Sequence, residues 1–172
     1  MGSRNSKARR VALYGMLTAL AFILSYVESL VPVTLGIPGV KLGLANLVVV
    51  IALYTLDLKG AFVISVVRIV LSGLTFGGLL SMLYSLAGGL FSFAVMAILS
   101  RKKVFGTVGV SVCGGVAHNI GQLLVAMAVL ETESVWYYFP VLLISGSVAG
   151  VLIGLLGGWM TGRVQDYLAK RR

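Results

Sequence analysis

The sequence predicts an all-α integral membrane protein, built as a bundle of six transmembrane helices. Of its 172 residues, 59% are apolar and 11% are charged, and the mean hydropathy is +1.03. A soluble domain has about 45–50% apolar and about 25% charged residues. Long apolar runs recur along the chain, and basic residues gather at their ends. One cysteine and one histidine are too few for a disulfide framework or a zinc knuckle.

The first half of the chain predicts one full-length span and two shorter ones. Residues 11–31 form an apolar run of the length, about 20 residues, that a helix needs to cross a bilayer. Two prolines and two glycines within residues 32–39 predict a loop after it. Residues 42–56 and 61–74 are shorter runs joined by a tight turn at 57–60. Each must tilt, thin the bilayer or re-enter it.

The second half predicts three full-length spans. Residues 79–100 follow a predicted loop at 75–78 and stop at the basic cluster 101–103. Residues 104–130 stop at the polar stretch 131–134. The last span, residues 135–160, starts with aromatic side chains that suit a membrane–water interface.

The basic residues predict the orientation. Of the 14 lysines and arginines, 11 lie within residues 4–10, 101–103 and 163–172. Because cytoplasmic loops are enriched in such residues, both termini are expected in the cytoplasm of a multi-pass protein of the cell membrane. Residues 1–172 are then one membrane domain, with a basic N-terminus (1–10), the bundle (11–162) and a basic tail (163–172). No basic face remains for nucleic acid.

Small residues recur at helical spacing on three predicted helices. Such stripes let helix backbones approach closely within a membrane. One stripe, in the fourth span, consists of Ser81, Ser85, Gly88 and Ser92, and another, in the last, of Gly146, Gly150, Gly154 and Gly158. We interpret both as internal packing, with a docking face as the alternative for the last. On the first helix, packing and partner docking are equally open for Ala8, Ala12, Gly15 and Ala19.

Polar side chains inside the predicted spans mark a candidate binding site, because such groups are costly in lipid and usually face the bundle interior. All fall in the outer halves of their helices and come from five of them, which favours a pocket open to the outside and closed below. With one lysine of the first outer loop, the candidate ligand-binding residues are Glu28, Lys41, Asn46, Arg68, Tyr84, His118, Asn119 and Gln122.

Each group also has a purely structural interpretation. Arg68 either pairs with Glu28 or, together with Lys41, holds an anionic or carbonyl group of the ligand. His118, Asn119 and Gln122 either form an interhelical hydrogen-bond cluster or contact the ligand. We expect neither a metal site nor a cofactor, and Cys113 is interpreted as a core residue.

The sequence also argues against a stand-alone enzyme, and we assign no catalytic residue. It contains no G-x-x-x-x-G-K-[ST] loop for ATP. It has no aspartate pair to hold a Mg²⁺-bridged diphosphate, and only five acidic residues in total.

Four stretches together resemble the Gx transporter family, whose members are often labelled heptaprenyl diphosphate synthase component I. They are KLGLAN at 41–46, Arg68 followed by SGLTFG at 72–77, YSLAGG at 84–89 and HNIGQ at 118–122. The resemblance covers residues 11–162. That family is similar to the S components of energy-coupling factor transporters, six-helix proteins that capture micronutrients from outside. The resemblance implies that the chain docks, through small residues on its first helix, onto a transmembrane coupling subunit driven by two ATPases.

These observations lead to one expected function and two alternatives. We expect the substrate-binding subunit of an importer, with a small and possibly anionic ligand. The first alternative is a membrane subunit that assists polyprenyl diphosphate or quinone synthesis, and the second is a scaffold in a membrane redox complex.

Overall fold

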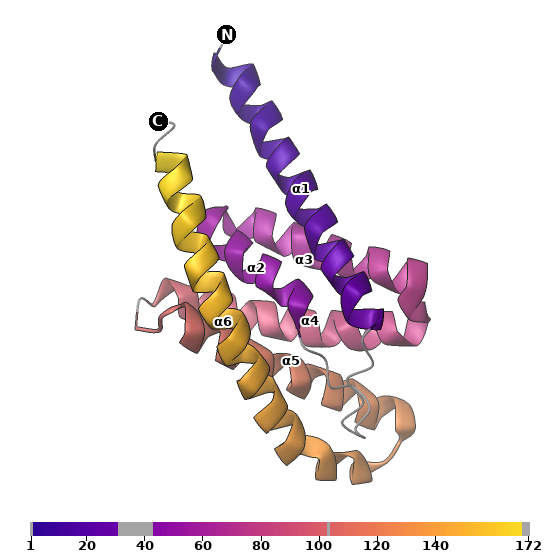
Figure 1. Cartoon of the computed structure of the whole chain (residues 1–172). Coiled ribbons are helices and arrows are strands. Elements are labelled where there is room, and N and C mark those ends of the chain that lie inside the picture. The colour runs from indigo at the N-terminus through magenta and orange to yellow at the C-terminus, as the bar shows by residue number, and fades with distance from the viewer. Residues whose placement is uncertain (1, 31–42, 103, 170–172) are drawn as a thin grey trace.

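The computed structural model describes residues 2–30, 43–102 and 104–169, and the described part is helical with no strand. It contains α1 (Gly2–Leu30), α2 (Leu44–Thr55), α3 (Leu58–Ser72) and α4 (Gly78–Arg101), then α5 (Thr107–Leu130) and α6 (Phe139–Ala169). A π-helical turn, η1 (Gly73–Gly77), joins α3 to α4, and a 3-10 helix, η2 (Glu133–Tyr138), precedes α6. The N-terminal end of α1 and the C-terminal end of α6 lie at the same end of the molecule (Figure 1).

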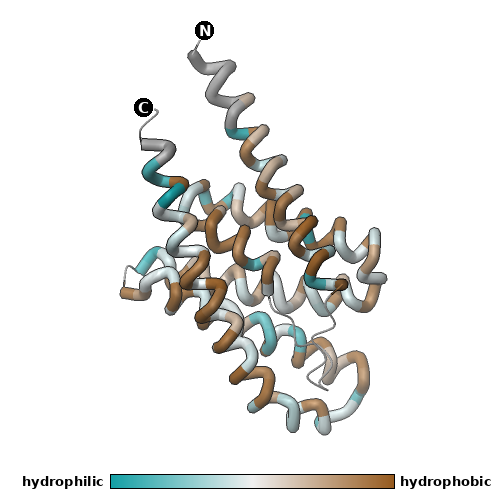
Figure 2. The backbone as a smooth tube through the Cα atoms, in the orientation of Figure 1, coloured by the Kyte–Doolittle hydropathy of each residue, from teal (hydrophilic) through white to brown (hydrophobic). Residues whose placement is uncertain are grey.

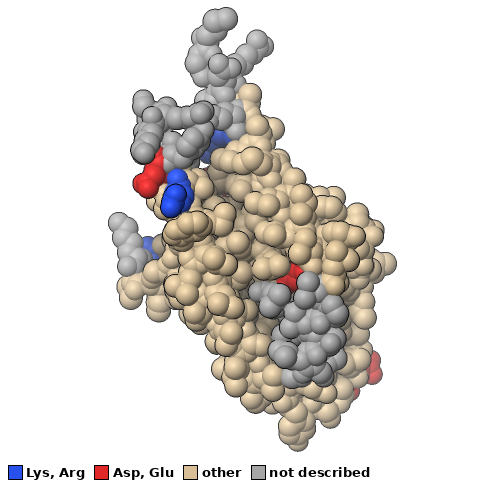
Figure 3. All heavy atoms as spheres, viewed as in Figure 1, with Lys and Arg blue, Asp and Glu red and all other residues tan. Residues whose placement is uncertain are grey.

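Four helical segments are long and apolar enough to cross a membrane, namely Arg10–Leu30, Leu58–Arg101, Thr107–Leu130 and Glu133–Asp166. The second segment contains both α3 and α4, which pack against each other, and α2 is a shorter apolar helix. Apolar residues run along most of the helices in Figure 2, and most of the face in Figure 3 is uncharged. These features are those of a helical membrane protein.

The prediction of a loop at residues 75–78 is wrong. In its place η1 continues helical hydrogen bonding from α3, and the chain reverses at Gly78, whose φ of +74° lies in the left-handed region. Backbone polar groups near lipid are best satisfied within a helix, so the turn is confined to one glycine. Among the other boundaries, α5 begins at Thr107 rather than 104 and α6 begins at Phe139 rather than 135. The helices α1 and α6 also extend beyond the predicted spans, to Gly2 and Ala169.

The short helix α2 lies at the centre of the molecule, between α1 and α6 in Figure 1. Val48, Val50 and Ala52 are fully buried there and pack with Ile64 of α3 and Ile153 of α6. A helix that is apolar all round is stable only when its neighbours cover it. This explains how so short an element is held in the core.

Glycines bring α5 and α6 into backbone contact. A Cβ added at Gly150 would lie 2.5 Å from the Cα of Val112, and one at Gly115 would lie 2.4 Å from the Gly146 carbonyl oxygen. Gly154 is equally tight against Val108. The interpretation of the α6 glycine stripe as internal packing is therefore confirmed.

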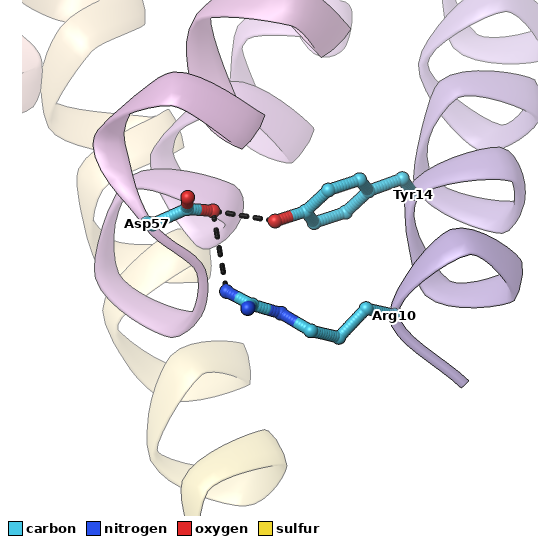
Figure 4. A network of polar contacts seen from close by, with 3 residues as sticks. All are labelled: Arg10, Tyr14 and Asp57. Carbon is cyan, nitrogen blue, oxygen red and sulfur yellow. Dashed lines mark hydrogen bonds and ion pairs between the residues drawn. The ribbon is translucent and has the colours of Figure 1, made fainter. Parts of the chain in front are cut away.

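A polar network ties α1 to the turn between α2 and α3 (Figure 4). The Tyr14 hydroxyl donates a hydrogen bond of 2.5 Å to Asp57 Oδ1, and Arg10 Nη2 lies 3.8 Å from the same oxygen. The hydrogen bond from Tyr14, aided by the charge of Arg10, holds the pKa of the exposed Asp57 carboxyl below its usual range. The contact lies far from the C-terminal end of α1, where the candidate site begins.

Candidate functional site

A cavity of about 340 Å³ lies among the helices of the bundle. All six described α-helices and η1 contribute to its wall, from Ser25 near the end of α1 to Ile153 in α6. Its size lies at the lower end of the range of small-molecule pockets, about 300–1,000 Å³. Part of its wall lies near the end of α1, in η1 and at the start of α4, and it extends to Met96 near the end of α4 and Ser111 near the start of α5.

Arg68 is the cationic side chain in the described wall of this cavity. It is 9% exposed, and its Nη2 donates a hydrogen bond of 2.8 Å to Asn46 Oδ1 on α2. Its Nε has no hydrogen-bond partner among the described residues. The Ser72 hydroxyl, one turn further along α3, is likewise buried without a described partner. Two polar groups of α3 on the cavity wall are therefore unsatisfied.

Glu28 also lines the cavity, but it does not form an ion pair with Arg68. One carboxylate oxygen accepts a hydrogen bond of 2.5 Å from the Gly43 backbone N–H, just before α2. Among the described residues, the charged pair within 4 Å is Arg10 with Asp57. Glu28 acts on Arg68 only as a nearby charge. Arg68 is thus left available to a ligand.

His118 and Asn119 reach the cavity from α5. Asn119 also has a structural task, because its Nδ2 donates a hydrogen bond of 2.6 Å to the Leu142 carbonyl oxygen of α6. Gly146 leaves the space for this amide, since a Cβ there would lie 2.7 Å from Asn119 Nδ2. Asn119 therefore connects the cavity wall to the α5–α6 contact.

The structure thus brings together five of the eight predicted site residues: Glu28, Asn46, Arg68, His118 and Asn119. Gln122 is buried against Gly88 in the α4–α5 contact, and Tyr84 is half-buried; neither is among the residues of the cavity wall. Lys41 lies outside the described residues. No group of three His, Cys, Asp or Glu side chains in the described part is close enough to hold a metal ion.

Serines are the part of the site that sequence reasoning missed. Seven of them line the cavity: Ser25, Ser29, Ser72, Ser81, Ser85, Ser92 and Ser111. Ser25 and Ser29 flank Glu28, and those of α4 belong to the small-residue stripe interpreted above as packing. Serines recurring on the helix face that also bears a charged residue are the signal that could have revealed them.

Aromatic rings close the cavity between α1 and η1. Phe76 lines the cavity, and its ring centroid lies 5.7 Å from that of Phe22 and 5.5 Å from that of Tyr26. Rings at these separations attract each other. This contact covers one side of the site.

The predicted docking residues Ala8, Ala12, Gly15 and Ala19 are all exposed on α1. A Cβ added at Gly15 would meet no atom within 4 Å. Within the described part of the chain this stripe is not used for packing, so it is free for lipid or a partner.

Comparison with known proteins gives one match. The family model for heptaprenyl diphosphate synthase component I matches residues 17–160. No curated protein and no solved structure matches the chain.

Proposed function

The chain belongs to the heptaprenyl diphosphate synthase component I family, and we propose that it is the substrate-binding subunit of a small-molecule importer, similar to an energy-coupling factor S component. The observation that supports this proposal is the cavity of about 340 Å³ lined by Arg68, Asn46, His118 and seven serines. Polar groups at this density within a lipid-embedded bundle are costly unless they serve a ligand. The sequence has no ATP-binding loop and no aspartate pair for a Mg²⁺-bridged diphosphate, which supports a binding role over a catalytic one.

The proposed topology has six crossings in the cell membrane, with both termini in the cytoplasm. The basic residues of the α4–α5 connection and of the two termini support it, since such residues are retained on the cytoplasmic side. The Arg68 side of the cavity then lies in the outer half of the bundle, and Met96 and Ser111 of its wall lie in the inner half. Ligand would enter from outside and be released inward when the bundle reorients.

Partner subunits are part of the proposal, because this chain has no ATP-binding loop. The exposed stripe of small residues on α1 offers a surface on which a transmembrane coupling subunit could pack closely. ATPases would then act through that subunit.

The family name favours a second candidate function, a membrane subunit that assists heptaprenyl diphosphate synthesis. This candidate predicts a soluble synthase as partner and a prenyl diphosphate as ligand. The two functions therefore differ in both partner and ligand.

One experiment tests both. The protein is purified gently from native membranes, and native mass spectrometry identifies retained small molecules and co-purified proteins. A retained small polar molecule together with ATPases supports the importer. A retained prenyl diphosphate together with a synthase overturns it in favour of the second candidate.

A matched pair of variants tests the docking surface. We expect Gly15→Leu to fold normally and to lose the partner subunits, because the position is exposed and a Cβ there meets no atom within 4 Å. Gly162→Leu, also at an open and exposed position but on α6, is the control and keeps them. Retention of partners in Gly15→Leu would contradict docking at this stripe.

A further inference from the structure

Two unsatisfied groups on α3 point to a chemical feature of the ligand. Arg68 Nε and Ser72 Oγ are buried on the cavity wall, one helical turn apart, without partners among the described residues. Buried polar atoms in native proteins nearly always have partners, so each such group needs an explanation. Both can donate a hydrogen bond, and a guanidinium can only donate. Their natural partner is therefore an acceptor that enters the cavity.

The bond from Arg68 to Asn46 leaves part of the guanidinium available. Asn46 Oδ1 accepts a hydrogen bond from Nη2, whereas Nε has no partner among the described residues. Asn46 offers Arg68 a neutral oxygen, and Glu28 is engaged by the Gly43 N–H. The buried guanidinium thus lacks a contact counter-ion among the described residues, although buried charges are normally paired.

We propose that Arg68 and Ser72 form a carboxylate subsite, and that the captured ligand is a compact molecule with one carboxylate bound there. This inference rests on the proposed capture function and names the ligand class. A carboxylate oxygen accepts from Arg68 Nε, and the Ser72 hydroxyl donates to the same group. Charge-assisted bonds of this kind are the strong ones in proteins.

The charge of the cavity favours a single carboxylate over a diphosphate. Its described wall contains one cation, Arg68, and one anion, Glu28. A diphosphate would bring several negative charges into a site with a single guanidinium, and uncompensated buried charge is strongly unfavourable. The modest volume likewise suits a compact molecule better than a long prenyl chain.

The far end of the ligand is expected to bear a hydrogen-bonding group. Ser92 on α4 is 2% exposed, and its hydroxyl has no partner among the described residues. It lies on the cavity wall beside Gly114 of α5, where a Cβ would be 3.2 Å from the Ser92 hydroxyl oxygen. An alcohol, amide or ring nitrogen of the ligand would satisfy it.

The test uses three probes of defined charge on the detergent-purified chain at equal ionic strength: butyrate, its neutral isostere butyramide, and pyrophosphate. Thermal unfolding, followed by tryptophan fluorescence, gives an apparent Kd for each. We expect butyrate to stabilise the protein more than either other probe. Arg68→Gln should weaken butyrate binding roughly ten- to a hundredfold, and Ser72→Ala about two- to tenfold. Arg101→Gln, which removes an exposed cation outside the cavity, should change nothing.

Equal stabilisation by butyrate and butyramide would overturn the inference, as would tighter binding of pyrophosphate. If Arg68→Gln does not fold, Ser72→Ala decides, and unchanged butyrate affinity in that variant counts against the subsite. If native mass spectrometry identifies a retained neutral molecule, the proposal of a carboxylate subsite is overturned and the capture function stays intact. A retained prenyl diphosphate together with a synthase would overturn the capture function itself.

Discussion

Arg68 of α3 and Asn46 of α2 are joined by a hydrogen bond of 2.8 Å across the wall of the cavity. The two residues belong to the two shortest α-helices in the described part of the chain. Each of these helices is too short to be positioned by its own length in a bilayer of about 30 Å. The bond therefore does two things, because it aligns α2 with α3 and holds the guanidinium against the cavity.

Removing the Asn46 amide should lower stability. Asn46→Ala leaves Nη2 of a buried guanidinium without its acceptor, and loss of such a charged hydrogen bond costs about 1.5–3 kcal/mol. Asn46→Asp is the matched variant, since it keeps an acceptor oxygen at the same place and should retain most of the stability. It should nevertheless weaken butyrate binding by supplying Arg68 with a competing carboxylate. Thermal unfolding with and without butyrate measures both effects. Equal destabilisation by both substitutions would assign the loss to packing.

A methyl group at Gly150 should disrupt the α5–α6 contact. The added Cβ would lie 2.5 Å from the Cα of Val112 and 2.9 Å from the Ser111 carbonyl oxygen, and backbone atoms cannot move aside singly. Overpacking of this kind typically costs about 1–3 kcal/mol. Gly162→Ala on the same helix meets nothing within 4 Å and is the control. Urea unfolding in mild detergent compares the two variants, and equal stability would show that the two helices can separate without cost.

The polar residues of the site could be predicted from sequence because polar side chains are costly, and therefore rare, within membrane-spanning helices. Arg68 and His118 stand in apolar runs where a charged or polar group is unexpected, and both line the cavity. Serine gives no such signal, since its small side chain suits helix packing as well as ligand binding. Gln122 shows the opposite failure. Its position resembles that of His118 one turn earlier, and Gly88 of α4 approaches both residues, yet only His118 of the two lines the cavity.

The connection between α3 and α4 could not be predicted for a different reason. Glycine at 73, 77 and 78 is typical of a loop, and local propensity favours that interpretation. In the structure only Gly78 uses the conformational freedom of glycine, and Gly73 instead makes room for Met82, to which a Cβ would lie 2.5 Å away. Tertiary packing therefore decided the conformation.

Acid should weaken the attachment of α1 to the α2–α3 turn. The pKa of Asp57 is lowered in the folded protein, chiefly by the hydrogen bond from Tyr14, so folding favours the ionised carboxylate. Its contribution to stability is fully present above the unfolded value of about 3.9 and is lost as the pH falls through the lower folded value. The thermal unfolding temperature of the wild type should therefore fall more steeply below about pH 4 than the unfolding temperature of Asp57→Asn. Parallel curves for the two proteins would contradict this role of Asp57.

The proposed six-crossing topology can be tested at the two ends of the bundle. In a Cys113→Ala background, which removes the single native cysteine, we introduce Lys59→Cys at the start of α3 or Ser134→Cys in η2. If α2 and α3 each cross the membrane, a membrane-impermeant thiol reagent applied to intact cells labels Ser134→Cys and spares Lys59→Cys, while inside-out vesicles give the reverse.

The decisive comparison is between these two sites, because both are exposed in the folded chain and differ only in the expected side. Permeabilised cells, in which both cysteines should react, control for accessibility. Labelling of both variants from the outside would mean that α2 and α3 both re-enter the membrane without crossing it. The Arg68 side of the binding cavity, which α2 and α3 help to enclose, would then no longer be placed in the outer half of a six-crossing bundle, and entry of ligand from outside would have to be abandoned.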